Sequence, residues 1–156
     1  MPSFSARASS SASHNMKLSK NVKVKPWFWN LIPWVSKNTA QAIYPNIYLP
    51  VHVYQNLISN KPDIRHTALL AHEQEHIRRQ QVVGVVWWMI QYFINPKFRF
   101  EEELAADIPR MKIFKQRGAK FDIETRAKKL SGWLYFWPVS YQKAKTSLQL
   151  ARKRLG

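Results

Sequence analysis

His72, Glu73 and His76 form the pattern in this sequence that is best suited to chemistry. The two histidines stand at i and i+4, so on a helix both imidazoles project from one face and can bind one metal ion. Glu73 directly follows the first histidine, and this position lets its carboxylate reach a metal-bound water rather than the metal. The motif His-Glu-x-x-His therefore indicates zinc-assisted hydrolysis with one zinc ion per chain.

A catalytic zinc needs a third protein ligand, and carboxylates are the side chains that this sequence offers for it. The chain has no cysteine, and every other histidine precedes His72 and His76. Glu103 and Asp107 also stand at i and i+4, so Glu103 can bind the metal while Asp107 accepts the free N–H of a ligand histidine. The alternative is that residues 101–103 form a solvated acidic turn near a helix N-terminus, where the helix dipole favours acids.

Four segments in a fixed order carry a resemblance to known proteins: Ile47–Pro50, Leu69–Arg79, Asn95–Pro96 and Glu103–Asp107. In this order the chain resembles the gluzincin metallopeptidases. It is more closely similar to the peptidase domains of the β-lactam-sensing antirepressor, CAAX-prenyl-endopeptidase and HtpX-like families. The resemblance implies His72, His76 and Glu103 as zinc ligands, Glu73 as the general base and Asp107 as the residue that orients a ligand.

The same resemblance implies how a peptide or protein substrate binds. Residues 47–53 correspond to an edge strand on which the substrate pairs through its backbone, with contacts from Ile47, Tyr48, Leu49 and Val51. Such families often place a His or Tyr beyond the third ligand to stabilise the oxyanion. No histidine follows here, and the candidates are Tyr135, Tyr141 and Arg110. Those relatives are usually integral membrane proteins, whereas no apolar run in this chain reaches the ~20 residues of a spanning helix.

The elements around the motif predict an α+β fold: a small, mainly helical zincin-like domain of four or five helices with a short antiparallel sheet or hairpin. Capping residues and periodicity predict helices over 63–80, 98–117, 123–130 and from Ser140. Residues 41–54 are rich in β-branched and aromatic side chains, with a turn at 45–46. Pro50 cannot donate a ladder hydrogen bond, so the expected strand at 47–53 lies at a sheet edge.

Two apolar segments each allow two interpretations. Residues 82–94 are almost wholly apolar and predict a buried core helix, with insertion into one face of a membrane as the alternative. Residues 26–34 form an aromatic cluster bounded by Lys25 and Lys37. This cluster either packs on the core or anchors the chain at a membrane interface.

The net charge of +16 in 156 residues is unevenly distributed. Residues 1–25 are Ser-rich and free of acids, and we expect a disordered basic tail there, which leaves 26–156 as a single domain. Six of the nine acidic residues fall within 73–107, which marks that region for chemistry. Basic flanks are compatible with contact to an anionic membrane. Nucleic acid is disfavoured because no RNP, Gly-rich or zinc-finger motif accompanies the charge.

Three functions remain open from the sequence: a zinc endopeptidase, a non-catalytic zincin-like module that keeps the metal for structure, and a basic membrane- or nucleic-acid-binding protein. Bound zinc separates the first two from the third, and turnover separates the first from the second. No secretory signal is recognisable, which favours a cytoplasmic or peripheral membrane location. The sequence does not predict an oligomeric state.

Overall fold

The computed structural model describes residues 18–31, 38–132 and 139–156. Within them, six α-helices and a small three-stranded sheet form a mainly helical α+β fold, as the sequence predicted. The helices are α1 (Val51–Leu57), α2 (Ile64–Val83), α3 (Val85–Ile94), α4 (Pro96–Gln116), α5 (Ile123–Leu130) and α6 (Tyr141–Arg154). A 3-10 helix, η1 (Trp27–Leu31), precedes the second strand.

The sheet is mixed, whereas the sequence predicted an antiparallel sheet or hairpin, because residues of the predicted tail add a parallel strand. Strands β1 (Val22–Val24), β3 (Asn46–Leu49) and β2 (Gln41–Ile43) lie in that order, with β1 parallel and β2 antiparallel to β3. The prediction of a disordered tail over residues 1–25 is wrong for its last residues, because Val22 is buried and pairs with Ile47. Residues 1–17 lie outside the described residues.

The predicted edge strand at 47–53 is also wrong. β3 is the central strand, with neighbours on both sides, so its backbone has no free edge for a substrate. Its Ile47 and Leu49 are buried in the core. Pro50 ends the strand, and Val51 begins α1, because the lack of a proline N–H costs nothing just before a helix. Tyr48 packs on the ring of Trp29 instead of lining a free edge.

Local sequence signals fix the helices that matter for the site. Asp63 caps α2 by accepting a hydrogen bond from the backbone N–H of Arg65. Gly84 has φ +95°, a backbone conformation that other residues rarely adopt, and it turns the chain from α2 into α3. Asn95 then caps α4, with Pro96 at its first position. These caps set α2 and α4 at the lengths needed to lie against each other.

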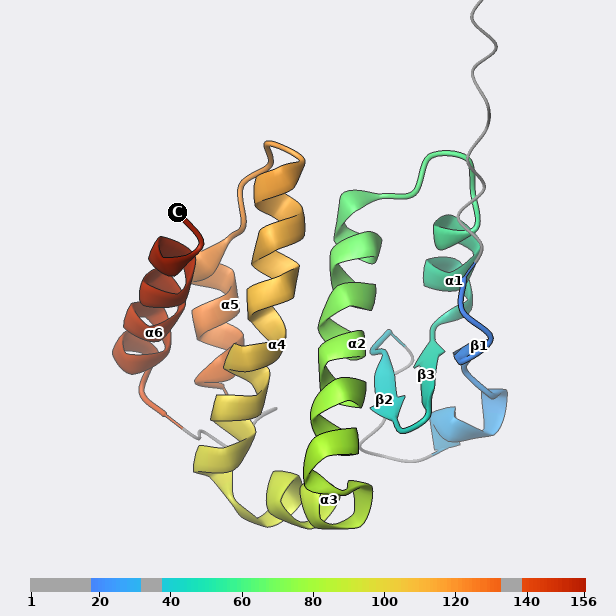
Figure 1. Ribbon diagram of the computed structural model, residues 1–156, viewed down its shortest axis with the longest axis horizontal. Coiled ribbons are helices and arrows are strands. Elements are labelled where there is room, and N and C mark those ends of the chain that lie inside the picture. The colour runs from blue at the N-terminus through green and yellow to red at the C-terminus, as the bar shows by residue number, and fades with distance from the viewer. Residues whose placement is uncertain (1–17, 32–37, 133–138) are drawn as a thin grey trace, which may run out of the picture.

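Two apolar cores flank the α2/α4 pair (Figure 1). One joins the sheet and α1 to α2, and it contains Leu49, Val53 and Leu70. The other joins α4 to α5 and α6, and it includes Ala144, Leu148 and Ala151 of α6. α2 and α4 run side by side between these cores, so the side chains that they direct toward each other form a separate layer.

α3 is not the buried core helix that the sequence predicted. It lies across the end of the α2/α4 pair and appears nearly end-on at the bottom of Figure 1. Trp88 is its one buried residue, while Val86, Trp87 and Phe93 are more than half exposed. Apolar composition predicted burial, but only one side of α3 has a helix to pack against. No helix in the described parts of the chain has both the length and the apolar character to cross a membrane.

Candidate metal centre

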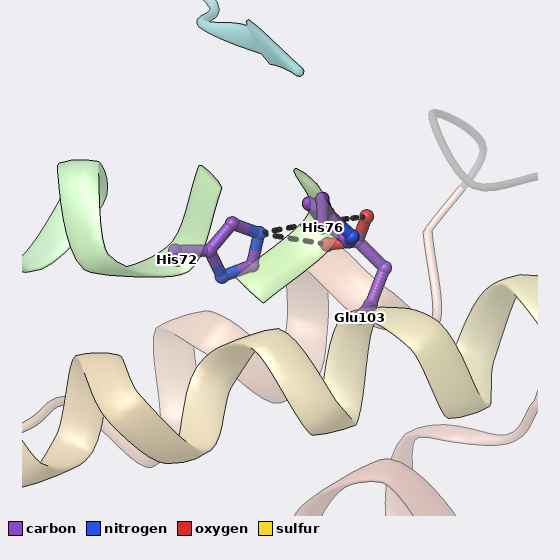
Figure 2. Close-up of side chains that lie close together, drawn as sticks. All are labelled: His72, His76 and Glu103. Carbon is purple, nitrogen blue, oxygen red and sulfur yellow. Dashed lines mark hydrogen bonds and ion pairs between the residues drawn. The ribbon is translucent and has the colours of Figure 1, made fainter. Parts of the chain in front are cut away.

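Three buried side chains from α2 and α4 converge on one point (Figure 2). The Nε2 atoms of His72 and His76 lie 3.2 Å apart. Glu103 places Oε2 at 3.5 Å from Nε2 of His72 and Oε1 at 3.4 Å from Nε2 of His76. Each of the three residues is at most 5% exposed. The i, i+4 spacing of the histidines thus produces the shared face that the sequence predicted.

These separations match what zinc requires. A tetrahedral zinc holds N and O ligands at about 2.0–2.2 Å, which places the ligand atoms about 3.3–3.6 Å from one another. The two imidazole nitrogens, 3.2 Å apart, are close to that spacing. The 3.5 and 3.4 Å contacts involve different oxygens of Glu103, and one donor atom from each of the three residues lies within 4.8 Å of the other two, so a small adjustment brings them around one ion. Two nitrogens and one carboxylate oxygen are also a donor set that zinc uses in catalytic sites. The residues present therefore fit the metal.

Asp107 lies behind the site, where the sequence predicted it. Its Oδ1 is 3.2 Å from Nδ1 of His72, the ring nitrogen that faces away from Glu103. Asp107 is fully buried. A carboxylate in this position orients the imidazole and makes its other nitrogen a better metal ligand. The Nδ1 atom of His76 is buried and has no hydrogen-bond partner among the described residues, so the two histidines are held differently.

Arg126 and Tyr92 complete the site, and neither residue was predicted from the sequence. The guanidinium of Arg126, from α5, donates to Oδ2 of Asp107 at 2.5 Å and to Oε2 of Glu103 at 2.7 Å. The hydroxyl of Tyr92, from α3, donates to Oε1 of Glu103 at 2.5 Å. Both are contacts between residues distant in the sequence, and no local pattern indicates them. They fix the Glu103 carboxylate while leaving a lone pair on each oxygen.

Glu73 and Glu75 lie in different surroundings, as the motif predicts. Glu73 is buried and lines the same cavity as His72, His76 and Glu103. Burial raises the pKa of Glu73, and the neighbouring histidines oppose that shift only in part. Glu75 instead forms a bidentate ion pair with Arg78 on the outside of α2. The two carboxylates on one helix therefore differ in surroundings, and only Glu73 faces the candidate metal centre.

The pKa values of His72, Glu103 and Asp107 are shifted from their usual ranges. Burial disfavours the charged form of His72, but hydrogen bonds and charge from Asp107 and Glu103 outweigh it and raise its pKa to about 9. Burial likewise acts against ionised Glu103, yet His72 and His76 hold the pKa of Glu103 well below its usual range. In Asp107, burial is outweighed by Arg126 and then by His72, and the pKa is lowered. Metal binding at neutral pH must therefore displace a proton from His72.

The acidic run at 101–103 is not the solvated turn considered as an alternative. Only Glu101 is exposed, and it lies 4.0 Å from Lys97. Glu102 is 1% exposed; it accepts a bidentate hydrogen bond from Arg79 and another from Nε1 of Trp88. Glu102 thus ties α2, α3 and α4 together, while its neighbour Glu103 faces the metal centre.

A cavity of about 560 Å³ opens beside the site, and β2 forms one of its walls. Of the oxyanion candidates, Arg110 lines this cavity, Tyr141 is instead bonded to Glu124, and Tyr135 lies outside the described residues. β2 is the outer strand on this side, and Gln80 occupies part of its edge. The amide of Gln80 donates to the carbonyl of Ala42 and accepts from the N–H of Tyr44.

Comparison with known proteins adds no identification. No protein-family model, no curated protein and no solved structure matches this chain. The resemblance to gluzincin peptidases therefore remains a prediction from four short segments of sequence.

Proposed function

We propose that this protein is a zinc-dependent peptidase. The observation that carries the proposal is the convergence of His72, His76 and Glu103 at separations suited to one tetrahedral metal, with Glu73 in the same cavity. A site with three protein ligands leaves a fourth position for water, which is the arrangement of catalytic rather than structural zinc.

The residues divide the chemistry among themselves. Zinc, when bound, would lower the pKa of a coordinated water toward about 7 and polarise a substrate carbonyl. Glu73 takes the water proton on its carboxylate and later passes it to the leaving amine. Asp107 holds the His72 imidazole through Nδ1, and Arg126 and Tyr92 hold Glu103. The raised pKa of Glu73 brings this carboxylate closer to the proton affinity that a general base needs near neutral pH.

The cavity supports a peptide as the substrate class. Residues 38–40 and β2 line the cavity together with the histidines, so an extended chain can lie between the strand and the metal centre. Gln80 bonds to the strand edge at Ala42 and Tyr44, and Lys25 donates to the carbonyl of Thr39, so a substrate in the cavity would lie beside these contacts.

A matched pair of variants tests the proposal. Glu73→Gln keeps the size of the side chain but removes its basicity, so it should retain zinc and lose about 100-fold or more of the peptidase activity. Glu75→Gln makes the same change three residues from His72, where the side chain faces Arg78, and should keep activity. Both are assayed on a peptide library, with zinc content measured in parallel. Equal cleavage by wild type and Glu73→Gln would overturn the general-base role.

A non-catalytic metal-binding module is the second candidate. The ion pair of Glu103 with Arg126 favours it, because such a pair also stabilises the α4/α5 packing without any reaction. Full zinc content in a wild-type protein that cleaves no peptide in the library would support this module over the peptidase.

A further inference from the structure

The outer face of α3 is an exposed apolar surface that the metal centre does not explain. Val86, Trp87, Ile90, Phe93 and Ile94 are 45–73% exposed. At 100° per residue they fall on one side of the helix, opposite the buried Trp88. Val82 and Val83, at the end of α2, extend this face, at 75% and 39% exposed. A helix that is apolar all round is normally covered on all sides, so this face indicates a partner.

A second apolar group lies at the same end of the molecule. Trp27 and Phe28 of η1 are 75% and 51% exposed, and Figure 1 places η1 and α3 at the lower end of the fold. Trp29, from the same 3-10 helix, lines the cavity together with Met89 and Phe93 of α3. Both η1 and α3 therefore contribute to the lining of the cavity. Trp and Phe at the edge of an apolar face are typical of segments that lie in the membrane interface.

The charges on and around α3 and η1 indicate which kind of partner the apolar face binds. α3 and η1 contain no charged residue, and no acidic residue precedes Asp63 in the whole sequence. Exposed cations lie near the face: Lys97 is in the first turn of α4, three residues after the end of α3, and Lys129 lines the same cavity as Phe93. Glu101 is the exposed acid nearby, and Lys97 lies 4.0 Å from it. With a net charge of +16, a second copy of the chain is repelled, whereas an anionic surface is attracted.

We propose that the outer face of α3 docks on an anionic lipid bilayer, with the α3 axis in the plane of the surface. Ten residues of helix measure about 15 Å, half of the roughly 30 Å hydrocarbon thickness, so α3 lies in the interface and does not cross it. Because Phe93 belongs to this face and also lines the cavity, docking places the cavity beside the headgroup region. Cleavage of the substrate at the membrane surface would follow from this docking, and that consequence rests on the proposed function. The docking itself does not depend on the proposed function.

Vesicle sedimentation tests the docking with the full chain. Phosphatidylcholine vesicles containing about one third phosphatidylserine should bind the protein, pure phosphatidylcholine should bind it weakly, and added salt should release it. Trp87→Ser combined with Ile90→Ser removes apolar area from the face and should weaken binding roughly 10-fold or more. Leu150→Ser on α6, a residue 53% exposed, is the matched control and should bind as wild type does.

A charge pair refines the same test. Lys97→Gln should weaken binding about fivefold, the effect of one cation at such a surface, and Lys143→Gln on α6 should not change it. Glu73→Gln should bind vesicles normally, so a failure of the peptidase proposal does not alter this result. The docking is overturned if neither vesicle binds, or if the α3 double variant binds as tightly as wild type. It is also overturned if the chain forms a dimer that the double variant dissociates and shows no vesicle binding.

Discussion

The α2/α4 interface and the outer face of α3 depart from the usual distribution of side chains in opposite directions. The interface buries charged groups, among them Glu102, Glu103 and Asp107, each with ion-pair partners. The outer face of α3 exposes Trp87 and Phe93. Both arrangements cost folding free energy, the first through desolvation and the second through lost burial.

The two regions differ in where the partners of their unusual side chains are found. The buried charges are already paired within the chain, and they hold three donor atoms in one place for a metal. The exposed apolar side chains are completed only by something outside the chain. A domain selected for stability alone needs neither feature, so both point to function, one to an internal site and the other to a surface.

The largest expected effect is the loss of stability when Glu102, a buried acid outside the candidate ligand set, is replaced. Glu102→Ala leaves the Arg79 guanidinium and the Trp88 N–H without their acceptor and should lower the free energy of unfolding by about 3 kcal/mol. Glu101→Ala, one residue earlier and exposed, should change it by less than about 0.5 kcal/mol. Denaturant unfolding of the metal-free proteins measures both. Equal values for the two variants would contradict the assignment of Glu102 as a buried tie between helices.

Replacing Asp107 tests whether its carboxylate strengthens metal binding by orienting His72. Asp107→Asn should weaken zinc affinity by about 10–100-fold, because His72 loses the carboxylate at its Nδ1. Competition with a chelator of known affinity measures the change, and Glu101→Gln serves as the control on the same helix. Unchanged affinity in a folded Asp107→Asn protein would remove Asp107 from the metal centre.

The stability of the metal-free protein should depend on pH in a defined direction. His72 has a pKa of about 9 in the folded chain and about 6.5 when unfolded, so its stabilising contribution is complete below about 6.5 and is lost as pH rises through about 9. The difference between these two pKa values corresponds to about 3 kcal/mol over pH 6.5 to 9.5, so the melting temperature should fall by roughly 6–12 °C in a domain of this size. The zinc-loaded protein should lack this contribution, because its imidazoles are already deprotonated. A melting temperature that rises over this range would contradict the His72 environment.

The smallest expected effect belongs to α3. Val86→Ser, at a position 73% exposed, should change the free energy of unfolding by less than about 0.5 kcal/mol. A large loss of stability would mean that this side chain is covered within the folded chain, and the comparison between the two regions would fail.

The parts of the site that the sequence predicted are those governed by helical periodicity. His72 with His76, and Glu103 with Asp107, share a face because residues four apart always do so on a helix. Arg126, Tyr92 and Arg79 were missed because their partners depend on how helices distant in the sequence pack. No local spacing encodes such a contact.

The fold shows the same division. Helix starts at Asp63 and Ser140 agree with their capping residues, because a cap is a local interaction. The strand at 47–53 was extended too far because Val51 and Val53 favour strands on their own, whereas Val53 and Leu57 are buried together on α1. The exposure of α3 was missed because composition gives apolar character, not the presence of a neighbour to cover it.

Zinc stoichiometry tests the central claim most directly. Purified wild-type protein reconstituted with zinc and dialysed should contain about one zinc per chain, and His76→Ala less than about 0.2. His52→Ala removes an exposed histidine on α1 and should keep the full content. Wild-type protein without zinc, or His76→Ala protein with as much zinc as wild type, would contradict the metal centre.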